Sequence, residues 1–275
     1  MKLWPAACFI GGMSSQAKLS VIFILLTAPI FPAQAERDLS VYEIKPAIDG
    51  PIIGVTAIAA SLAYLSSDRW IHRRCPCDPN EVNAFDRSAI GNSNATLDTL
   101  SDITLGAAIF GPPILDFIDL GFSREFKQDM WVYVETFSVN SFFTTFAKYT
   151  AERPLTRTYA GDPALVNSPG GYRSFYSGHT STVFSALSTA AVTLNLRYHQ
   201  GGWPWLVVAG LGASVGVERV AAGRHFPTDV MVGAVAGTAV GLLVPYWHQK
   251  GDGGGLMVTA APIDDGAIIF AKLGF

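Results

Sequence analysis

Three observations predict an all-α protein built as a bundle of about six core helices. Apolar segments with helical periodicity and length recur along the chain. Polar, turn-rich stretches separate several of these segments. Of the 275 residues, 49% are apolar, which is enough for a large core in one domain. The six segments cover residues 51–66, 103–120, 130–149, 179–196, 203–217 and 229–247.

The N-terminus has the pattern of an export signal. Lys2 and Lys18 precede the apolar run 19–31, and Ala33-Gln34-Ala35 fits a small-residue cleavage site. We therefore expect an exported protein whose mature chain begins near Glu36. A first membrane anchor that stays attached is the alternative for this segment.

Two stretches between the helical segments are expected to be long loops, residues 68–98 and 160–172, because Asn, Asp, Pro and Gly are frequent in them. Cys75 and Cys77 lie in the first of these loops. In an oxidising compartment this close pair forms a disulfide or stays unpaired. Two sulfur ligands without a second pair are a weak zinc signal, so we predict no metal site.

The helical segments are marginal as membrane spans. Those at 103–120 and 130–149 contain acidic residues, and only the segment at 229–247 approaches the roughly 20 apolar residues that a span needs. The sequence favours a bundle in the periplasm that rests on the inner membrane or lies partly in it. A bundle whose later segments cross the membrane remains the alternative, and in both cases the active site is expected to face the periplasm.

The last helix and the tail carry two further patterns. Gly233, Gly237 and Gly241 recur every fourth residue, which predicts close packing against another helix. In the tail, the apolar runs 256–261 and 267–273 flank a turn signal, which suggests a short β-hairpin. The predicted organisation is a signal peptide at 1–35, a helical domain at 36–250 and the tail at 251–275.

The strongest chemical pattern joins Arg219, His225 and Asp229. Pro227 fits the start of a helix, and Asp229 can accept a hydrogen bond from one imidazole nitrogen of His225. That bond would fix the tautomer and leave the other nitrogen as a nucleophile. Arg219 supplies a forked donor that matches phosphate oxygens. The alternative is a solvated loop with an incidental His and Asp.

Ser177, Gly178 and His179 directly precede or begin another helical segment. Ser177 fits an N-cap, Gly178 lets the backbone approach a ligand, and the free amides of the first turn suit an oxyanion. His179 stands where a proton donor to a leaving group is needed. An ordinary capped helix with a solvent-facing His is the alternative.

A third group of cations, Lys148, Arg153 and Arg157, lies around the end of the segment 130–149. Cations are also favoured at a helix C-terminus by the macrodipole, so a purely structural role is the alternative.

In this order, the three elements resemble the type 2 phosphatidic acid phosphatase and vanadium haloperoxidase superfamily, over residues 107–241. The family pattern is K-x6-R-P, then P-S-G-H, then S-R-x5-H-x3-D. This chain departs from it at Glu218, which replaces Ser, and at Tyr176, which replaces Pro. The first motif is also shorter, with only four residues between Lys148 and Arg153.

The resemblance implies a phosphoric ester hydrolase that needs no metal or cofactor. His225 would attack phosphorus and form a phosphohistidine, Asp229 would orient it, and His179 would protonate the leaving alcohol and then activate water. Arg153 is preferred over Arg157 as a phosphate ligand because Pro154 follows it. The implied phosphate-binding groups are Lys148, Arg153, Ser177, the amide of Gly178, and Arg219.

The expected substrates are phosphomonoesters, lipid phosphates or lipid pyrophosphates. Two alternatives are a catalytically degenerate scaffold that binds an anion or lipid, and a vanadate-dependent haloperoxidase. A net charge of −3 gives no general attraction for nucleic acid, so we expect no nucleic-acid partner. A phosphorylated small molecule or lipid and a membrane are the expected partners, and the sequence does not predict an oligomeric state.

Overall fold

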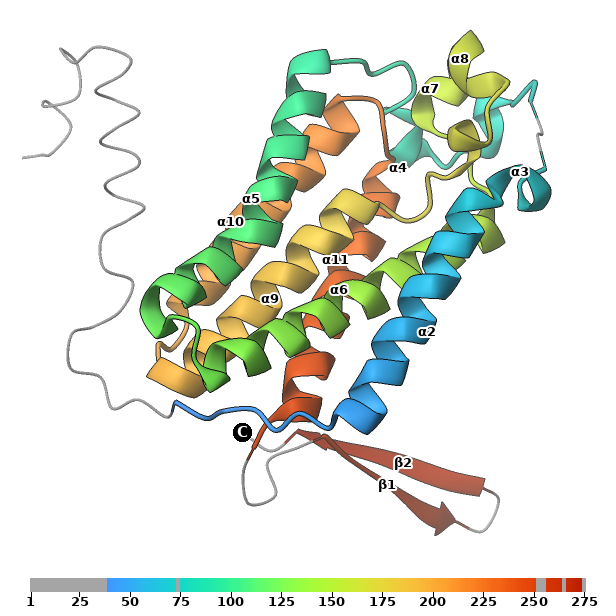
Figure 1. Ribbon diagram of the computed structural model, residues 1–275. Coiled ribbons are helices and arrows are strands. Elements are labelled where there is room, and N and C mark those ends of the chain that lie inside the picture. Colours follow the sequence, from blue (N-terminus) through green and yellow to red (C-terminus); the bar gives the residue numbers. More distant parts are fainter. Residues whose placement is uncertain (1–38, 73–74, 251–255, 264–265, 274–275) are drawn as a thin grey trace, which may run out of the picture. The chain divides into compact units, whose positions relative to one another are not determined.

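The computed structural model describes residues 39–72, 75–250, 256–263 and 266–273, and the predicted export signal lies outside these residues. The all-α prediction is confirmed, because long helices form most of the described chain (Figure 1). These helices are α2 (Pro46–Leu65), α5 (Ala95–Leu120), α6 (Arg124–Ala151), α9 (Gly178–Tyr198), α10 (Trp203–Ala221) and α11 (Pro227–His248).

Polar caps explain why two helices begin earlier than expected. Asn94 precedes α5 and its side chain accepts a hydrogen bond from the Leu97 amide at 3.0 Å. Ser123 precedes α6 and accepts from the Phe126 amide at 3.1 Å. Each cap satisfies a backbone donor of the first turn, so the helix continues into polar residues that an apolar pattern does not include.

Short helical turns lie in and directly beside the two predicted long loops. Asp and Asn side chains cap several of these turns and give the backbone local hydrogen bonds. Cys75 and Cys77, in the first stretch, are joined by a disulfide. The turns are α3 (Ser67–Trp70), η2 (Pro79–Glu81), α4 (Ala84–Arg87), α7 (Thr156–Tyr159), α8 (Pro163–Val166) and η3 (Pro169–Tyr172).

The predicted tail hairpin is present as β1 (Leu256–Ile263) and β2 (Gly266–Leu273). The two strands pair antiparallel, with Leu256 opposite Leu273 and Ile263 opposite Gly266. The turn signal read from the sequence therefore lies between the strands, as expected.

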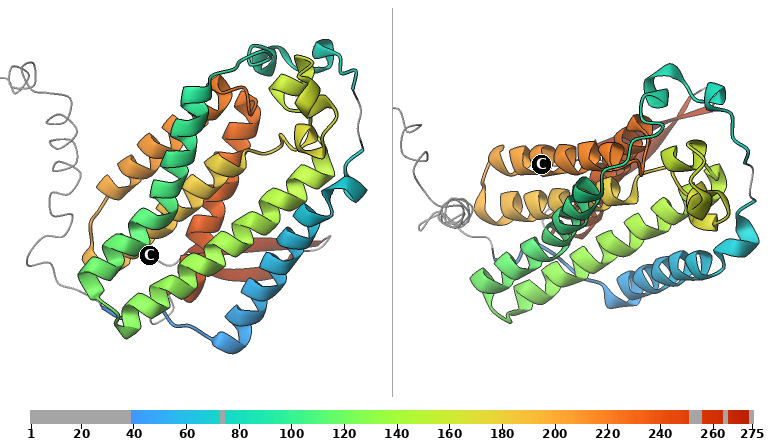
Figure 2. Two further views of the ribbon diagram at one scale, coloured as in Figure 1. Left: turned by 45° about the horizontal axis from the view of Figure 1, so that its top comes forward. Right: turned by 90° about the horizontal axis from the view of Figure 1, so that it is seen from above.

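Helix α9 is the central helix of the bundle. It packs against α5, α6, α10 and α11, while α2 packs on α6 (Figure 2). Val183 and Leu187 of α9 form an apolar core with Ala108 of α5 and with Val208 and Val215 of α10. This arrangement fixes the first turn of α9 beside the first turn of α11, where the predicted site residues lie.

The glycine face of α11 packs closely against α9, which confirms the prediction from the sequence. A Cβ atom at Gly237 would lie 2.2 Å from the Ser181 carbonyl oxygen, and one at Gly241 would lie 2.4 Å from that of Ser185. A Cβ at Gly233 would meet the carbonyl oxygen of Ser177, the residue before α9, at 2.7 Å. Only glycine permits this approach without moving one helix away from the other.

We expect Gly237→Ala to destabilise the fold by about 1–3 kcal/mol, since the added methyl overlaps backbone rather than a movable side chain. Gly106→Ala on α5 is the matched control, because nothing lies within 4 Å of its Cβ position. Thermal melting of both variants in detergent measures the effect. Equal melting temperatures for the two would contradict the packing argument.

Three helices of the described chain, α2, α5 and α11, are long and apolar enough to cross a membrane. Their outward side chains are strongly apolar, as at Val55, Ile114 and Val235, which are 67%, 56% and 71% exposed. Many exposed apolar side chains on three long helices fit a bilayer better than water. The protein is therefore membrane-associated.

Candidate active site

The predicted site residues come from the ends of α6, α9, α10 and α11, and the structure brings them together. The Ser177 amide, just before α9, donates to the Asp229 carbonyl at 3.0 Å. A Cβ atom at Gly178 would lie 3.8 Å from Cε of Lys148. The charges of Lys148 and Arg219 act on His225, whose pKa they help to lower.

His225 is buried, with 4% of its surface exposed, in the turn between α10 and α11. Its Nδ1 atom faces Asp229 Oδ2 at 3.8 Å. That separation is too long for the direct hydrogen bond expected from the sequence. Burial, followed by the nearby cations, lowers the pKa of the imidazole to about 4, so the ring is neutral at neutral pH.

Asp229 is held rigidly by neighbours other than His225. Its Oδ2 atom accepts from the Ser174 hydroxyl at 2.5 Å and from the Phe226 amide at 3.0 Å. Its Oδ1 atom accepts from Arg153 at 2.6 Å. The carboxylate is therefore fixed beside the imidazole, in a helix whose first residue is Pro227, as predicted.

Both terminal nitrogens of Arg153 are bound to carboxylates. One donates to Asp229 and the other donates to Asp86 at 2.8 Å. Asp86 also accepts from the Thr228 amide at 3.0 Å, and these bonds keep its pKa below the usual range although burial opposes them. In this geometry Arg153 holds Asp229 in place through an ion pair. Arg157, the other candidate, pairs with Asp162 at 2.5 Å.

Lys148 supports the segment that leads into α9. Its ammonium donates to the carbonyls of Arg173 and Tyr176, both at 2.8 Å. A lysine ammonium has three donors, so one remains for an anion. Tyr176, which replaces the Pro of the family pattern, thus contributes a backbone acceptor that anchors Lys148.

Ser177 is the N-cap of α9, as predicted. Its hydroxyl oxygen accepts from the Thr180 amide at 3.4 Å and from the Thr180 hydroxyl at 3.0 Å. The hydroxyl is fully buried in these contacts. The amides of Gly178 and His179 belong to the first turn, where a helix has no carbonyl partner for them and where the dipole favours an anion.

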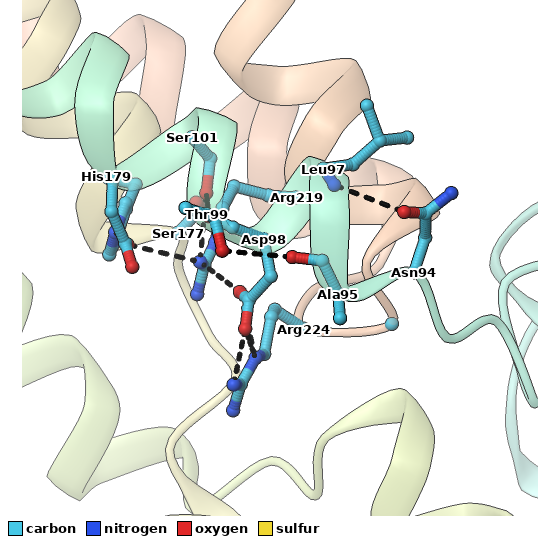
Figure 3. Close-up of polar contacts among 12 residues, drawn as sticks. Asn94, Ala95, Leu97, Asp98, Thr99, Ser101, Ser177, His179, Arg219 and Arg224 are labelled. Atoms are coloured by element: carbon cyan, nitrogen blue, oxygen red, sulfur yellow. Dashed lines mark hydrogen bonds and ion pairs between the residues drawn. The ribbon is translucent and has the colours of Figure 1, made fainter.

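His179 has an acidic partner that the sequence did not indicate. Its Nε2 atom lies 2.8 Å from Asp102 Oδ1, on α5, and a quarter of its side chain is exposed. One turn earlier on α5, Asp98 accepts from Arg219 at 2.9 Å and from Arg224 at 2.6 Å (Figure 3). Asp98 and Asp102 are four residues apart, so both project from the same face of α5.

Three carboxylates and one guanidinium at the site were therefore missed by sequence reasoning: Asp86, Asp98, Asp102 and Arg224. The spacing of Asp98 and Asp102 at the start of an apolar helix was a signal for one acidic face. Their partners lie far away in the sequence, so the pattern could not identify them.

The assembled groups can support transfer of a phosphoryl group. A buried neutral imidazole lies beside a fixed carboxylate, a second histidine is paired with an acid, and cations and helix amides surround them. Such positioned donors stabilise negative charge on equatorial oxygens.

Comparisons with known proteins find similarity over the region that holds the site. The model of the PAP2 superfamily matches residues 129–252, which include all three motifs. The resemblance found in the sequence is thus confirmed over that region. A crystal structure of a transmembrane PAP2 type phosphatidylglycerolphosphate phosphatase from Bacillus subtilis is also similar, with 18% identity, a TM-score of 0.42, and coverage of 71% of this chain and 93% of that one.

Three curated proteins show local similarity. Lipid A 1-phosphatase of Porphyromonas gingivalis is 38% identical over 76 residues, which are 27% of this chain and 16% of that protein. The bacitracin transport permease protein BcrC of Bacillus licheniformis is 38% identical over 74 residues, 27% of this chain and 32% of that protein. Probable diacylglycerol pyrophosphate phosphatase 1 of Schizosaccharomyces pombe is 31% identical over 110 residues, 35% of this chain and 38% of that protein. The matches thus span well under half of each relative.

Proposed function

We propose that this chain, whose residues 129–252 match the PAP2 superfamily, is a membrane-associated phosphatase that hydrolyses lipid phosphates or pyrophosphates through a phosphohistidine. The observation that carries the proposal is the pairing of a buried neutral imidazole at His225 with the fixed carboxylate of Asp229. A neutral imidazole has the lone pair that attack on phosphorus requires.

In the proposed reaction, Nδ1 of His225 faces Asp229, so Nε2 attacks phosphorus. Lys148, Arg219 and the first amides of α9 bind the phosphoryl oxygens. His179, paired with Asp102, gives its proton to the departing oxygen and then takes one from water. Water cleaves the phosphohistidine, releases phosphate and restores His225.

The position of His179 supports a lipid substrate over a soluble one. Its partner Asp102 is 64% exposed and is followed directly by Ile103, which is 62% exposed on α5. The polar site thus opens beside an apolar helix that can lie against acyl chains, while a phosphate headgroup reaches the histidines.

A scaffold that binds an anionic lipid without hydrolysis is the second candidate. Two observations favour it: Arg153 is bound to two carboxylates, and Lys148 donates to two carbonyls. Fewer donors are then left for a transition state than the family pattern implies.

Phosphate release separates the two candidates. The purified full-length chain in detergent and chelator is given phosphatidate, a lipid pyrophosphate and a soluble aryl phosphate. If the chain is a phosphatase, we expect phosphate release, and we expect it to be fastest with the two lipids. At a temperature where the fold is intact, the chelator should not change the rate. No phosphate release from any of the three substrates, together with retained binding to phosphatidate vesicles, would favour the scaffold.

The buried imidazole also predicts an unusual pH profile. Because burial lowers the pKa of His225 to about 4, its nucleophilic neutral form persists when acid is added to a neutral solution. We expect kcat/KM to fall from protonation of His225 only below a pH of about 4, since this ratio reports the ionisation of the free enzyme. Far-ultraviolet circular dichroism at each pH controls for unfolding. An acidic limb near pH 6.5 with an intact fold, after correction for the second ionisation of the substrate phosphate, would contradict a buried nucleophile of low pKa.

A further inference from the structure

Three buried ionisable side chains meet at the end of α11 that is opposite Asp229. His248 is the last residue of α11, Asp49 lies in the first turn of α2, and Glu135 lies within α6. They are 3%, 2% and 4% exposed. Helix α11 has 22 residues, so at about 1.5 Å per residue this cluster is about 33 Å from the candidate active site.

Backbone contacts hold the start of α2, which carries Asp49, beside the end of α11, which carries His248. The Glu43 amide donates to the His248 carbonyl at 2.8 Å, and Tyr42 pairs with Gln249 in an antiparallel bridge. These contacts join the segment before α2 to the end of α11. The Lys45 amide then donates to Asp49 Oδ2 at 2.6 Å, which fixes the carboxylate.

The tautomer of His248 follows from its neighbour. Nδ1 lies 2.9 Å from the Val244 carbonyl, which can only accept, so Nδ1 carries a proton. In the neutral ring, the lone pair of Nε2 then points toward Asp49 and Glu135. A backbone acceptor on one imidazole nitrogen is the common support for a histidine whose other nitrogen binds a metal.

The distances within the cluster fit a metal better than a shared proton. Nε2 of His248 lies 3.4 Å from Asp49 Oδ2 and 3.4 Å from Glu135 Oε2. A charge-assisted hydrogen bond would be about 2.7–2.9 Å. Ligands at about 2.0–2.1 Å from a tetrahedral zinc ion lie about 3.3 Å from each other. The ligand atoms of all three residues are within 4.8 Å of one another.

Two of these atoms lack any other partner in the described chain. Nε2 of His248 and Oε2 of Glu135 are buried and make no hydrogen bond there. A buried lone pair that faces two carboxylates is costly unless Nε2 takes up a proton or a metal cation lies between the three groups, and the 3.4 Å separations are long for the proton.

We propose that Asp49, Glu135 and His248 bind one tetrahedral divalent cation of the zinc class, with water as the fourth ligand. One imidazole and two carboxylates suit Zn²⁺, whereas Ca²⁺ and Mg²⁺ require more oxygen ligands than this cluster offers. The ion joins α2, α6 and α11 and neutralises both carboxylates. Its role is structural, and the proposal does not rest on the proposed phosphatase activity.

Metal uptake by the full-length chain tests this proposal. The chain, purified without a polyhistidine tag, is stripped with chelator and titrated with Zn²⁺ and separately with Co²⁺, and bound metal is measured by mass spectrometry. We expect about one Zn²⁺ per chain, visible Co²⁺ absorption of tetrahedral intensity, and a higher melting temperature with zinc. Glu135→Gln should weaken binding at least about tenfold and abolish the thermal shift.

Glu43→Gln is the matched control, because Glu43 is exposed near the same helix end and should leave uptake unchanged. If Glu135→Gln does not fold, Asp49→Asn provides the same comparison. Wild-type chain that binds no Zn²⁺ or Co²⁺, or that binds no more than Glu135→Gln, would overturn the proposal.

Discussion

Replacement of His225 by alanine is expected to reduce phosphate release at least about a thousandfold, because the proposed covalent intermediate forms on this imidazole. The imidazole is buried beside Asp229, and its removal leaves the carboxylate bound to Arg153, Ser174 and the Phe226 amide. The fold should therefore survive. Initial rates with phosphatidate in detergent measure the loss, and circular dichroism and melting temperature report the fold.

His199→Ala is the control for this substitution. His199 is an exposed residue at the C-terminus of α9, the helix whose opposite end carries the site. Its replacement should change the rate less than about twofold. Wild-type activity in His225→Ala would mean that another nucleophile performs the reaction.

Arg197→Met is expected to destabilise the protein by about 3–5 kcal/mol, the largest effect on stability that we predict. The guanidinium is 1% exposed and lies 2.7 Å from Asp129 and 3.1 Å from Asp116. Methionine fills the space but leaves two carboxylates without a cation.

Thermal or chemical unfolding in detergent measures this loss, and Arg124→Met is the control because Arg124 is exposed at the start of α6. If Arg197→Met is as stable as this control, the ion pairs of Arg197 make no net contribution to the free energy of unfolding. Activity per folded molecule should not change, because Arg197 lies at the end of α9 that is distant from His179.

The sequence predicted the helices because their apolar residues recur with helical spacing over long stretches. It placed the starts of α5 and α6 too late in the chain, because Asn94 and Ser123 cap polar first turns that the apolar pattern does not include. The glycines of α11 were also predictable, since a face of glycines has few uses other than close packing. That Ser181 supplies the opposing carbonyl depends on the register of α9 against α11, which spacing does not determine.

The site was predictable where its residues are close in sequence. The short motif around His225 and Asp229 folds into one turn and the start of one helix. Arg153 was different: the sequence suggested a phosphate ligand, but Asp86 from a distant turn pairs with it. A side chain with two competing partners cannot be assigned until the fold determines which one it meets.

Whether a helix can contact a bilayer depends on which of its side chains lie on the outer surface of the bundle. The mean hydropathy of a sequence segment reports this exposure only indirectly. Asp116 and Asp119 made the segment at 103–120 look marginal as a span. In the fold Asp116 pairs with Arg197 and Asp119 accepts from the Tyr198 hydroxyl, while α5 also carries outward apolar side chains such as Ile114. Paired acids facing other helices are compatible with a bilayer on the other side.

Trapping of the phosphorylated chain tests the central claim most directly. His179→Ala should slow hydrolysis of the intermediate, while an aryl phosphate with a good leaving group needs no acid to form it. Labelled phosphate from this substrate should therefore accumulate on the peptide that contains His225 in an acid-labile bond, and His225→Ala/His179→Ala should carry none. Slow phosphate release by His179→Ala with no label on His225, or equal label in the double variant, would contradict the phosphohistidine mechanism.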